Sequence, residues 1–401
     1  GVKTIGAYAF KGCTNLKSVE FANSINSFGT SCFESCSKLE SVELPSSLKV
    51  LSYRSFNGCS GLTSIELKEG LTTIVEECLA GTKISKLTFP STLSSLNNNS
   101  GTPFRGMNYL TDIDTSNNSY FNFTADKILL SADGTKLYFV PNIYTTLNVP
   151  EGVTTIITYA LFQCSKLTTL NLPKTMTTIG SLQNNNISAI NVASGNTSFT
   201  SINGNLYTAN GKELVKHVNK TESTFIVPEG CESFRTYSLR GQTNITAITL
   251  PESFKKLNGW ALEGCRITTL HITKNVSYIA TSSFASIIGT LKTLTIDSSN
   301  PYFNVINDIY VVSKNGKTLN AVILNASSYT IPSGVTTLAS NAFYAKTAMT
   351  SMVIPEGVTT INNSFDYCVN LQSITIPSTV TSIGSDCFSR CYKLSNITVN
   401  K

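Results

Sequence analysis

Cysteine is the residue type with the greatest chemical potential here, because eleven thiols are enough for a metal centre or a disulfide framework. No two cysteines, however, are separated by only two residues, the spacing typical of zinc ligands and redox pairs. Ten of them instead recur at two fixed positions, three after or directly before a Phe or Leu, and only Cys231 lies outside both. The ten are Cys13, Cys36, Cys59, Cys164, Cys265, Cys368 and Cys391, and then Cys32, Cys78 and Cys387. Such regularity predicts small buried structural residues, and it leaves disulfides between stacked cysteines open in an oxidising compartment.

Neither the histidines nor any common catalytic motif indicates an active site. His217 and His271 are the two histidines of the chain, and neither has a partner at the spacing of a metal site or a catalytic triad. No glycine-rich nucleotide loop, zinc-protease motif or nucleophile elbow occurs in the sequence. We therefore expect no catalytic residues, no cofactor and no metal, and a protein that is not an enzyme.

A set of polar side chains recurs once per repeat between two apolar residues. This alternation places the set on the exposed face of short strands, which makes its charged members candidates for ligand contact. These candidates are Glu20, Glu43, Glu66, Asp114 and His271. The glutamates predict a docking strip for a basic partner or a cation. The alternative is a solvated face whose charge is offset by Lys17 and Lys38.

Two large aromatic residues form the third candidate group. Tyr237 and Trp260 are 23 residues apart at the same position of neighbouring repeats, a position that Tyr8 and Tyr159 also occupy. Adjacent exposed aromatic rings can hold a sugar ring or anchor a protein partner. The alternative is that they pack over the side of the molecule without contacting a ligand.

The composition excludes several classes of function. Hydrophobic residues make up 41% of the chain and charged residues only 13%, which favours a folded protein over a disordered one. The net charge of +6 is spread thinly, without the Lys/Arg run expected of a nucleic-acid-binding protein. No stretch of 18 apolar residues suggests a membrane-spanning helix. We expect neither nucleic acid nor a membrane span.

The cysteines, polar residues and aromatic residues named above recur because the whole sequence is built from a repeat. Ile5, Phe28, Leu51 and Ile74 are each 23 residues apart, and five further apolar columns share this period. We count thirteen turns, of which those from Leu96 and Ile179 are irregular. One 23-residue unit cannot bury its own apolar side, so the turns must stack on one another.

The residues within one repeat predict its local structure. A Leu-x-x-Ile-x-Leu run forms a short strand, which a proline such as Pro45 or Pro173 ends because it cannot donate to a sheet. The following Ala-Phe-x-x-Cys stretch has near-helical spacing and predicts a short helical turn. The expected fold is an α/β solenoid that is predominantly β, with short helical turns.

Three segments interrupt the period, at about 116–150, 193–228 and 297–332. Each contains an Asp-Gly or Asn-Gly pair between apolar runs, which is the strongest short-range signal for a β-hairpin. The pairs are Asp133-Gly134, Asn210-Gly211 and Asn315-Gly316. We interpret the segments as inserted β-hairpins within one continuous domain over residues 1–401.

The repeat resembles a known family. Ala9-Phe10-x-x-Cys13-x-x-Leu16 and Ile376-Pro377-x-x-Val380-Thr381-x-Ile383 are similar to the BspA-like class of leucine-rich repeat, over essentially the whole chain. This resemblance implies a leucine-rich-repeat solenoid that is secreted or attached to the surface of a bacterium or parasitic protist. It supplies no ligand-contact residues.

The expected function is that of a non-enzymatic cell-surface or secreted protein, an adhesin or scaffold that presents its repeats to extracellular or cell-surface proteins. The alternative is a carbohydrate-binding module of a glycan-utilisation system. We expect an extracellular or cell-surface location. Neither end of the sequence shows a polar capping repeat, which predicts flanking sequence or end-to-end packing between molecules.

Overall fold

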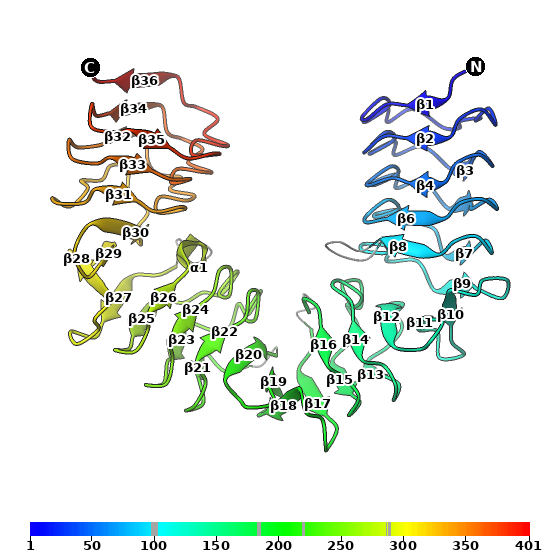
Figure 1. The fold of residues 1–401 in the computed structure, drawn as a ribbon, viewed down its shortest axis with the longest axis horizontal. Helices are drawn as coiled ribbons and strands as arrows, with labels where there is room; N and C mark the ends of the chain where they lie inside the picture. The colour runs from blue at the N-terminus through cyan, green and yellow to red at the C-terminus, as the bar shows by residue number, and fades with distance from the viewer. Residues whose placement is uncertain (98–102, 183–185, 219–220, 286, 288–289) are drawn as a thin grey trace. The chain divides into compact units, whose positions relative to one another are not determined.

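The computed structural model describes residues 1–97, 103–182, 186–218, 221–285, 287 and 290–401. It is a β-solenoid of about 17 turns in which short strands of successive turns lie side by side (Figure 1). The predicted solenoid is therefore confirmed, but the predicted thirteen turns are too few. One reason is that each insert ends in a strand that adds a turn of its own. Residues 98–102 and 183–185 of the two irregular turns, and 219–220 of the second insert, lie outside the described residues.

Each regular turn contributes two strands, and each strand pairs in parallel with its counterpart in the next turn. Ser41–Glu43 pairs with Ser64–Glu66, and Val50–Leu51 pairs with Thr73–Ile74, each at an offset of 23 residues. The offset equals the sequence period, so the repeat length sets the register. The central residue of β3, Val42, is buried between two exposed neighbours. The predicted alternation along the strand is thus confirmed.

The strands form four blocks separated by the inserts. The first block precedes the first insert and contains β1 (Thr4–Ile5), β2 (Ser27–Phe28), β3 (Ser41–Glu43), β4 (Val50–Leu51), β5 (Ser64–Glu66), β6 (Thr73–Val75), β7 (Lys86–Thr88), β8 (Ser95–Asn97) and β9 (Asp112–Asp114). The second contains β10 (Phe121–Phe123), β11 (Leu129–Ser131), β12 (Lys136–Phe139), β13 (Thr146–Asn148), β14 (Thr155–Ile156), β15 (Thr169–Leu172), β16 (Thr178–Ile179) and β17 (Ala189–Val192).

The third and fourth blocks follow the same plan. The third contains β18 (Phe199–Ile202), β19 (Asn205–Thr208), β20 (Glu213–Lys216), β21 (Thr224–Ile226), β22 (Ser233–Phe234), β23 (Ala247–Thr249), β24 (Lys256–Leu257), β25 (Thr269–Ile272), β26 (Tyr278–Ile279), α1 (Thr281–Ala285) and β27 (Thr293–Ile296). The fourth contains β28 (Phe303–Ile306), β29 (Tyr310–Ser313), β30 (Thr318–Val322), β31 (Thr337–Leu338), β32 (Ser351–Val353), β33 (Thr360–Ile361), β34 (Ser373–Ile376), β35 (Ser382–Ile383) and β36 (Asn396–Val399).

Each insert confirms the predicted hairpin and adds a strand before it. In the first insert, β10 pairs antiparallel with β11, and β11 pairs antiparallel with β12 around the Asp133-Gly134 turn. Gly134 has a φ of 74°, the left-handed conformation that such a turn needs. The last strand, β12, then pairs in parallel with β14. The third insert repeats this order with β28, β29, β30 and β31.

The inserts interrupt the sheets. Among the described strands, no sheet contains members from both sides of any of the three inserts. By contacts, the chain forms two compact units, Gly1–Ala209 and Asn210–Lys401. That the repeats form one continuous domain stays a prediction.

An asparagine anchors the start of each insert. Asn300 is fully buried; its Nδ2 donates to the carbonyls of Thr273 and Val276 in the preceding turn, both at 3.0 Å. Its Oδ1 accepts the backbone N–H groups of Tyr302 and Phe303 at 2.8 and 2.9 Å. Asn118 and Asn196 make the same four kinds of contact. We call these three residues the insert clips.

The predicted short helical turns are wrong for most of the described repeats. Within the Ala-Phe-x-x-Cys stretch, Glu34 and Cys36 donate their N–H groups to residues three positions earlier, whereas Phe33 and Ser35 donate to the next turn of the solenoid. Ser31 and Ser35 have left-handed φ values of 56° and 64°, which interrupt a right-handed helix. In the described part of the chain, helix is confined to α1.

The core follows the predicted apolar columns. Phenylalanine rings of neighbouring turns stack almost in parallel, with centroids 5.3 Å apart for Phe33 and Phe56, and 5.0 Å apart for Phe343 and Phe365. Parallel rings are the expected result when successive turns repeat the same backbone path. Within the described residues, no helix is long and apolar enough to cross a membrane.

Candidate binding surfaces

The cysteines three positions after Phe or Leu form an ordered interior column. Six of these thiols donate to a backbone carbonyl of the preceding turn, at Sγ–O distances between 3.1 and 3.4 Å. They are Cys36, Cys59, Cys164, Cys265, Cys368 and Cys391. Burial raises the pKa of Cys59 and Cys265 to about 12, so these thiols stay protonated and keep donating. The position therefore selects a small residue that can also donate a hydrogen bond, a requirement that the spacing alone did not reveal.

Burial of the predicted cysteine columns is confirmed with two departures. Cys13 is exposed, because it lies in the first turn and only one neighbouring turn covers it, and Cys391 is half-buried. Cys231 is buried where other repeats place Leu71 or Val153, so it belongs to a third apolar column. Among the described residues, no three His, Cys, Asp or Glu side chains lie together as metal ligands would.

Two lysines are buried inside the second unit. Lys346 occupies the cysteine column, three residues after Phe343, and its Nζ donates to the Ile323 carbonyl at 3.3 Å. Burial lowers its pKa to about 7. Lys216, in β20, is equally buried, and burial lowers its pKa to about 8. A lysine at the cysteine position keeps the donor but adds a charge that the interior disfavours.

The acidic strip exists, but a lysine bridges its central members. Glu43 and Glu66 lie opposite each other on β3 and β5, both exposed, and Lys68 Nζ is 2.7 Å from a carboxylate oxygen of each. Lys68 thus provides the offset that we assigned to Lys17 and Lys38, and Lys38 instead donates to Asn15. Glu20 is exposed but lies outside the described strands.

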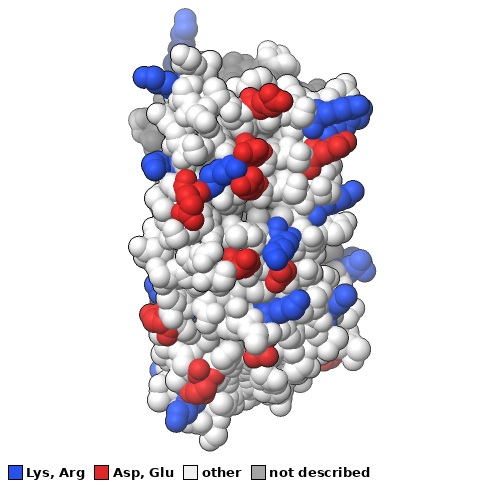
Figure 2. Space-filling view, turned by 90° about the vertical axis from the view of Figure 1, so that its right-hand side faces the viewer, with Lys and Arg blue, Asp and Glu red and all other residues white. Residues whose placement is uncertain are grey.

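The face around this strip carries mixed charge. Figure 2 shows the side of the N-terminal turns, where blue and red side chains are intermingled rather than separated by sign. Asp114, at the end of β9, lies opposite Thr88, and its pKa is lowered because the backbone N–H of Ser116 donates to it. Together with Lys86 and Phe123, Asp114 lines a shallow hollow of about 760 Å³ beside the first insert.

We call the polar residues at the exposed central position of the repeat strands the exposed strand column. Its side chains differ in chemistry from block to block. In the second block it is an amide ladder, in which Asn171 donates to Asn148 at 2.6 Å and Asn191 donates to Asn171 at 2.8 Å. In the third block His271 lies opposite Thr295, and the His271 Nδ1 is 2.8 Å from the Thr295 Oγ1. The side chains satisfy one another across the strands, so the column presents an ordered polar surface.

The structure gives Trp260 a ring partner that the sequence pattern did not predict. Its ring meets Tyr344 edge to face, with centroids 5.5 Å apart, although the two residues are 84 positions apart. Tyr344 stacks on Tyr367 at 6.2 Å, and the Arg390 guanidinium lies 5.4 Å from the Tyr367 centroid. We call Trp260, Tyr344, Tyr367 and Arg390 the aromatic ladder.

Ion pairs position the arginines that contact the exposed aromatic rings. Arg390 makes two hydrogen bonds to the buried Asp366, at 3.0 and 2.6 Å. Tyr237, the other predicted aromatic candidate, has the Arg240 guanidinium 5.1 Å from its ring centroid, and Arg240 pairs with Glu263. Tyr237 and Trp260 both have left-handed φ values, 63° and 57°, as do Tyr8 and Tyr159 at the same repeat position.

In the first unit, a cation makes the contact between the two sides of an insert. Arg105, before the first insert, lies 4.4 Å from the ring centroid of Tyr159 and 4.8 Å from that of Phe162, both beyond the insert. It also pairs with the buried Glu77, which accepts a second ion pair from Arg54 at 2.7 Å. We call this arrangement the cationic bridge.

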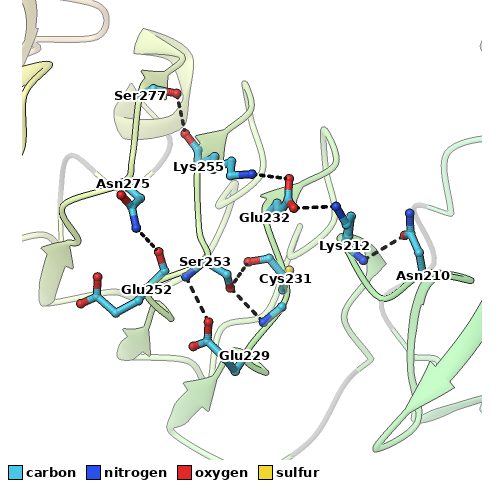
Figure 3. A network of polar contacts seen from close by, with 11 residues as sticks. Asn210, Lys212, Glu229, Cys231, Glu232, Glu252, Ser253, Lys255, Asn275 and Ser277 are labelled. Carbon is cyan, nitrogen blue, oxygen red and sulfur yellow. Dashed lines mark hydrogen bonds and ion pairs between the residues drawn. The ribbon is translucent and has the colours of Figure 1, made fainter.

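Ion pairs and hydrogen bonds connect adjacent turns near β20, β22, β24 and β26. Figure 3 shows Glu232 between Lys212 and Lys255, at 2.9 and 3.0 Å, and these contacts lower its pKa. Ser253 accepts the N–H of Gly230 through its Oγ and donates its own N–H to Glu229. Gly70 with Thr92, Gly152 with Thr175 and Gly357 with Thr379 make the same contact. The polar side chains described here therefore connect adjacent turns to each other.

The repeat pattern also identifies the family. A sequence model described as BspA type leucine rich repeat region matches residues 1–118, 136–215, 216–309 and 321–401. The chain belongs to this family. The resemblance seen in the Ala-Phe-x-x-Cys motif is therefore confirmed, and no curated protein matches.

Three solved bacterial repeat structures are similar to the chain. A leucine rich cell surface protein from Faecalibacterium prausnitzii is 21% identical, with 100% of this chain and 83% of that chain covered and a TM-score of 0.37. A leucine-rich repeat protein from Eubacterium ventriosum is 19% identical, with 91% and 84% covered and a TM-score of 0.38. The pneumococcal vaccine antigen PcpA is 15% identical, with 99% and 73% covered and a TM-score of 0.34. At these values the similarities support no statement about function.

Proposed function

We propose that this BspA-type repeat protein is a non-enzymatic binding protein of the cell surface or the secreted fraction, an adhesin or scaffold for an extracellular or cell-surface protein. The aromatic ladder is the observation that carries the proposal. Trp, Tyr and Arg are the residues most enriched among those that dominate protein–protein binding energy. Here they come together from turns far apart in the sequence and are held in place by each other and by Asp366.

Rigid anchors favour affinity, because side chains that are already ordered lose little conformational entropy on binding. Tyr367 is 40% exposed, while its ring is fixed between Tyr344 and Arg390. The exposed strand column, with Glu43 and Glu66 in the first unit and His271 in the second, supplies an ordered polar surface in each unit. Direct ligand contact by these residues, and by Glu20, Asp114 and Tyr237, stays a prediction.

The same geometry weighs against a glycan as the ligand of the ladder. A sugar ring binds by laying its C–H groups on the face of an aromatic ring. Tyr344 and Arg390 come from the turns before and after Tyr367 and occupy its two faces, so its edge and its hydroxyl group remain for a partner. Hydroxyl and edge contacts suit a protein surface.

The test is binding of the purified chain to immobilised extracellular-matrix and plasma proteins and to a glycan array. We expect a protein ligand, and we expect Tyr367→Ala to weaken its binding by at least about tenfold, the usual effect of losing an interface anchor. Tyr392→Ala is the matched control, because Tyr392 is 75% exposed and makes no ring contact within the described residues. This variant should bind like the parent.

Three results would contradict the proposal. Binding that Tyr367→Ala and Tyr392→Ala weaken equally would remove the ladder from the contact surface. Binding to glycans alone would favour the carbohydrate-binding alternative. Turnover of an ester, peptide or glycoside by the purified chain would overturn the non-enzymatic assignment.

A further inference from the structure

One edge of strand β9, the last strand before the first insert, has no partner strand. Among the described strands, β9 pairs only with β7. Asp112 donates its N–H toward that side, to the Ser85 carbonyl at 3.2 Å. The Asp114 carbonyl accepts the N–H of Phe89 at 2.8 Å, also on that side. Because backbone groups alternate in direction along a strand, the N–H and C=O of Ile113 point toward the insert, where the described residues offer them no hydrogen-bond partner.

Strand β17 is the equivalent strand before the second insert, and there the chain closes the edge itself. Ile190 corresponds to Ile113, since each is the buried residue of its strand. The Ile190 N–H donates to the Gly204 carbonyl at 3.0 Å, and the Ile190 carbonyl accepts the Ser201 hydroxyl at 2.6 Å. Asn203 and Gly204, with left-handed φ values of 52° and 76°, form the tight turn between the paired strands β18 and β19. One hairpin turn thus supplies both an acceptor and a donor to the edge of β17.

The first insert lacks the residues that make this closure. Phe123 stands where the second insert has Ser201, and it has no hydroxyl group to donate. The loop is also longer, because residues 124–128 join β10 and β11, whereas residues 203–204 join β18 and β19. The longer loop is bonded to itself, since the N–H of its first residue donates to the carbonyl of its last at 3.0 Å. The first insert therefore has no two-residue turn to place against β9.

A hollow of about 760 Å³ separates β9 from this loop. Its wall includes Ile113 and Asp114 from β9 and Phe123 from β10, and its volume lies within the range of about 300–1,000 Å³ that is usual for ligand pockets. Ile113 is 2% exposed, and buried backbone groups are nearly always paired in folded proteins. The hollow thus presents one unpaired donor and one unpaired acceptor where the second insert supplies a partner for each.

We propose that this hollow binds a β-hairpin turn of the protein partner, which pairs with the free edge of β9 as the Asn203–Gly204 turn pairs with β17. A carbonyl at the tip of the partner's turn accepts the Ile113 N–H, and a hydroxyl or N–H group beside it donates to the Ile113 carbonyl. Small residues at the tip let the two backbones approach closely. Pairing at a sheet edge gains affinity from main-chain hydrogen bonds. The inference rests on the proposed function, since it takes the ligand to be a protein, and it adds a contact in the first unit to the aromatic ladder of the second.

The first measurement needs no ligand and uses the full chain. Hydrogen exchange is followed at single backbone amides by mass spectrometry or NMR. We expect the Ile113 amide to exchange at least about 100-fold faster than the Ile190 amide, because the Ile190 N–H is bonded to the Gly204 carbonyl and the Ile113 N–H faces an open hollow. This comparison tests the open edge within one molecule.

The second measurement is binding of a probe to the full chain. The probe is a synthetic peptide with the sequence of residues 199–208, the hairpin that closes the edge of β17, because β9 offers an equivalent edge. We expect a Kd of about 1 mM or lower, and slower exchange of the Ile113 amide in the bound chain. The same peptide with Ser201→Ala loses the donor to the Ile113 carbonyl, and we expect it to bind about fivefold more weakly.

A chain that closes its own hollow is the matching variant. It carries the sequence of residues 201–205 in place of residues 123–128, and we expect it to bind the probe at least about tenfold more weakly, because its own turn competes for the edge. Asn117→Ala is the control, because Asn117 is exposed and outside the wall of the hollow, and it should bind like the parent. Circular dichroism and urea unfolding check that both variants fold.

Three outcomes would overturn this proposal. Equal protection of the Ile113 and Ile190 amides in the free chain would show that β9 has no open edge, whether or not the variant with the replaced loop folds. Equal binding of the probe by the parent and by that variant would place the probe elsewhere. The third outcome is no binding at roughly 10 mM probe. The probe is a peptide of this chain and its site is in the first unit, so its failure leaves untouched the aromatic ladder, which Tyr367→Ala tests against a matrix or plasma protein.

Discussion

The first and third inserts both bring the loops on their two sides into contact, and the two units make this closure with different chemistry. After an insert's last strand the chain omits the long loop that a regular turn carries: β12 and β13 are joined by residues 140–145, whereas β14 and β15 are joined by 157–168. Loops on either side of the insert then lie next to each other. In the first unit the cationic bridge of Arg105 joins these loops, and in the second the Trp260–Tyr344 contact does.

The difference shows that the repeat backbone does not determine which side chains connect the two sides of an insert. The cationic bridge depends on a buried carboxylate, Glu77, and on two arginines that neutralise it. The contact between Trp260 and Tyr344 depends on apolar area and ring geometry, which dissolved ions hardly affect. The first insert should therefore respond to ionic strength and the third should not.

The turns that follow the two inserts should respond in opposite ways to pH. Lys346 and Cys164 occupy the same column, and burial lowers the pKa of Lys346 to about 7 and raises that of Cys164 to about 12. Between pH 7 and the ordinary lysine value of 10.5, unfolded Lys346 binds more protons than the folded residue, so stability rises with pH. Above the ordinary thiol value of 9.0, Cys164 ionises only when unfolded, so stability falls.

Urea unfolding between about pH 7 and 8.5 tests this contrast. The gain from Lys346 should approach about 1.4 kcal/mol per pH unit, and Lys346→Met should abolish this part of the slope and raise stability at pH 7. Lys216 contributes equally to both proteins and cancels in the comparison. If parent and Lys346→Met rise in parallel with pH, Lys346 does not titrate in this range.

The insert clips should be the most sensitive neutral residues. Asn300→Ala removes four hydrogen bonds and leaves two carbonyls and two N–H groups without partners, at a cost of about 3 kcal/mol. Asn118→Ala should cost about 2 kcal/mol, because Asn118 is less buried and water replaces part of the loss. Asn117→Ala, an exposed neighbour, is the control and should be neutral in chemical unfolding. Equal, small losses in all three would show that the clips contribute little.

The two closures themselves should contribute no more than the clips. Trp260→Ala loses the ring contact with Tyr344 and should cost about 2 kcal/mol. Arg105→Ala should cost about 1 kcal/mol, because Glu77 keeps its ion pair with Arg54. Midpoints of thermal or urea unfolding measure both. A larger loss for Arg105→Ala would mean that Arg54 alone cannot neutralise Glu77.

The smallest expected effect is a difference in salt dependence between the Arg105 and Trp260 contacts. Raising the salt concentration from roughly 0.05 to 0.5 M should reduce the cost of Arg105→Ala by a few tenths of a kcal/mol, because ions screen the half-exposed arginine. The cost of Trp260→Ala should stay the same or grow slightly. Equal salt dependence for both variants would contradict the distinction between the two closures.

The sequence predicts the parts of this fold that depend on local repetition. The 23-residue period sets the register of β3 with β5, and the Asp133-Gly134 pair places the hairpin turn of the first insert. The exposed position of Glu43 and Glu66 also follows from simple alternation along a strand. Each of these features requires only the residues of one or two neighbouring turns.

Contacts across the inserts were not predictable in the same way. The meeting of Trp260 with Tyr344 depends on how many residues an insert omits from the loop edge, which no column of the repeat records. Two signals were nevertheless present in the sequence. Lys346 stands three positions after Phe343, where cysteine is usual, and each insert begins with Asn followed three positions later by Phe. The second signal marks Asn118, Asn196 and Asn300, the insert clips.

The interruption of the sheets has a mechanical consequence. A repeat protein under tension carries force along its turns, and in a continuous sheet that load would be shared by a long row of backbone hydrogen bonds. At the inserts no described sheet continues, so tension there falls on side-chain contacts, such as the insert clips and, at the first insert, the Phe104–Phe139 ring contact. Stretching one molecule should therefore yield first at the inserts, as separate steps in a force–extension trace, while the stacked turns between them remain intact.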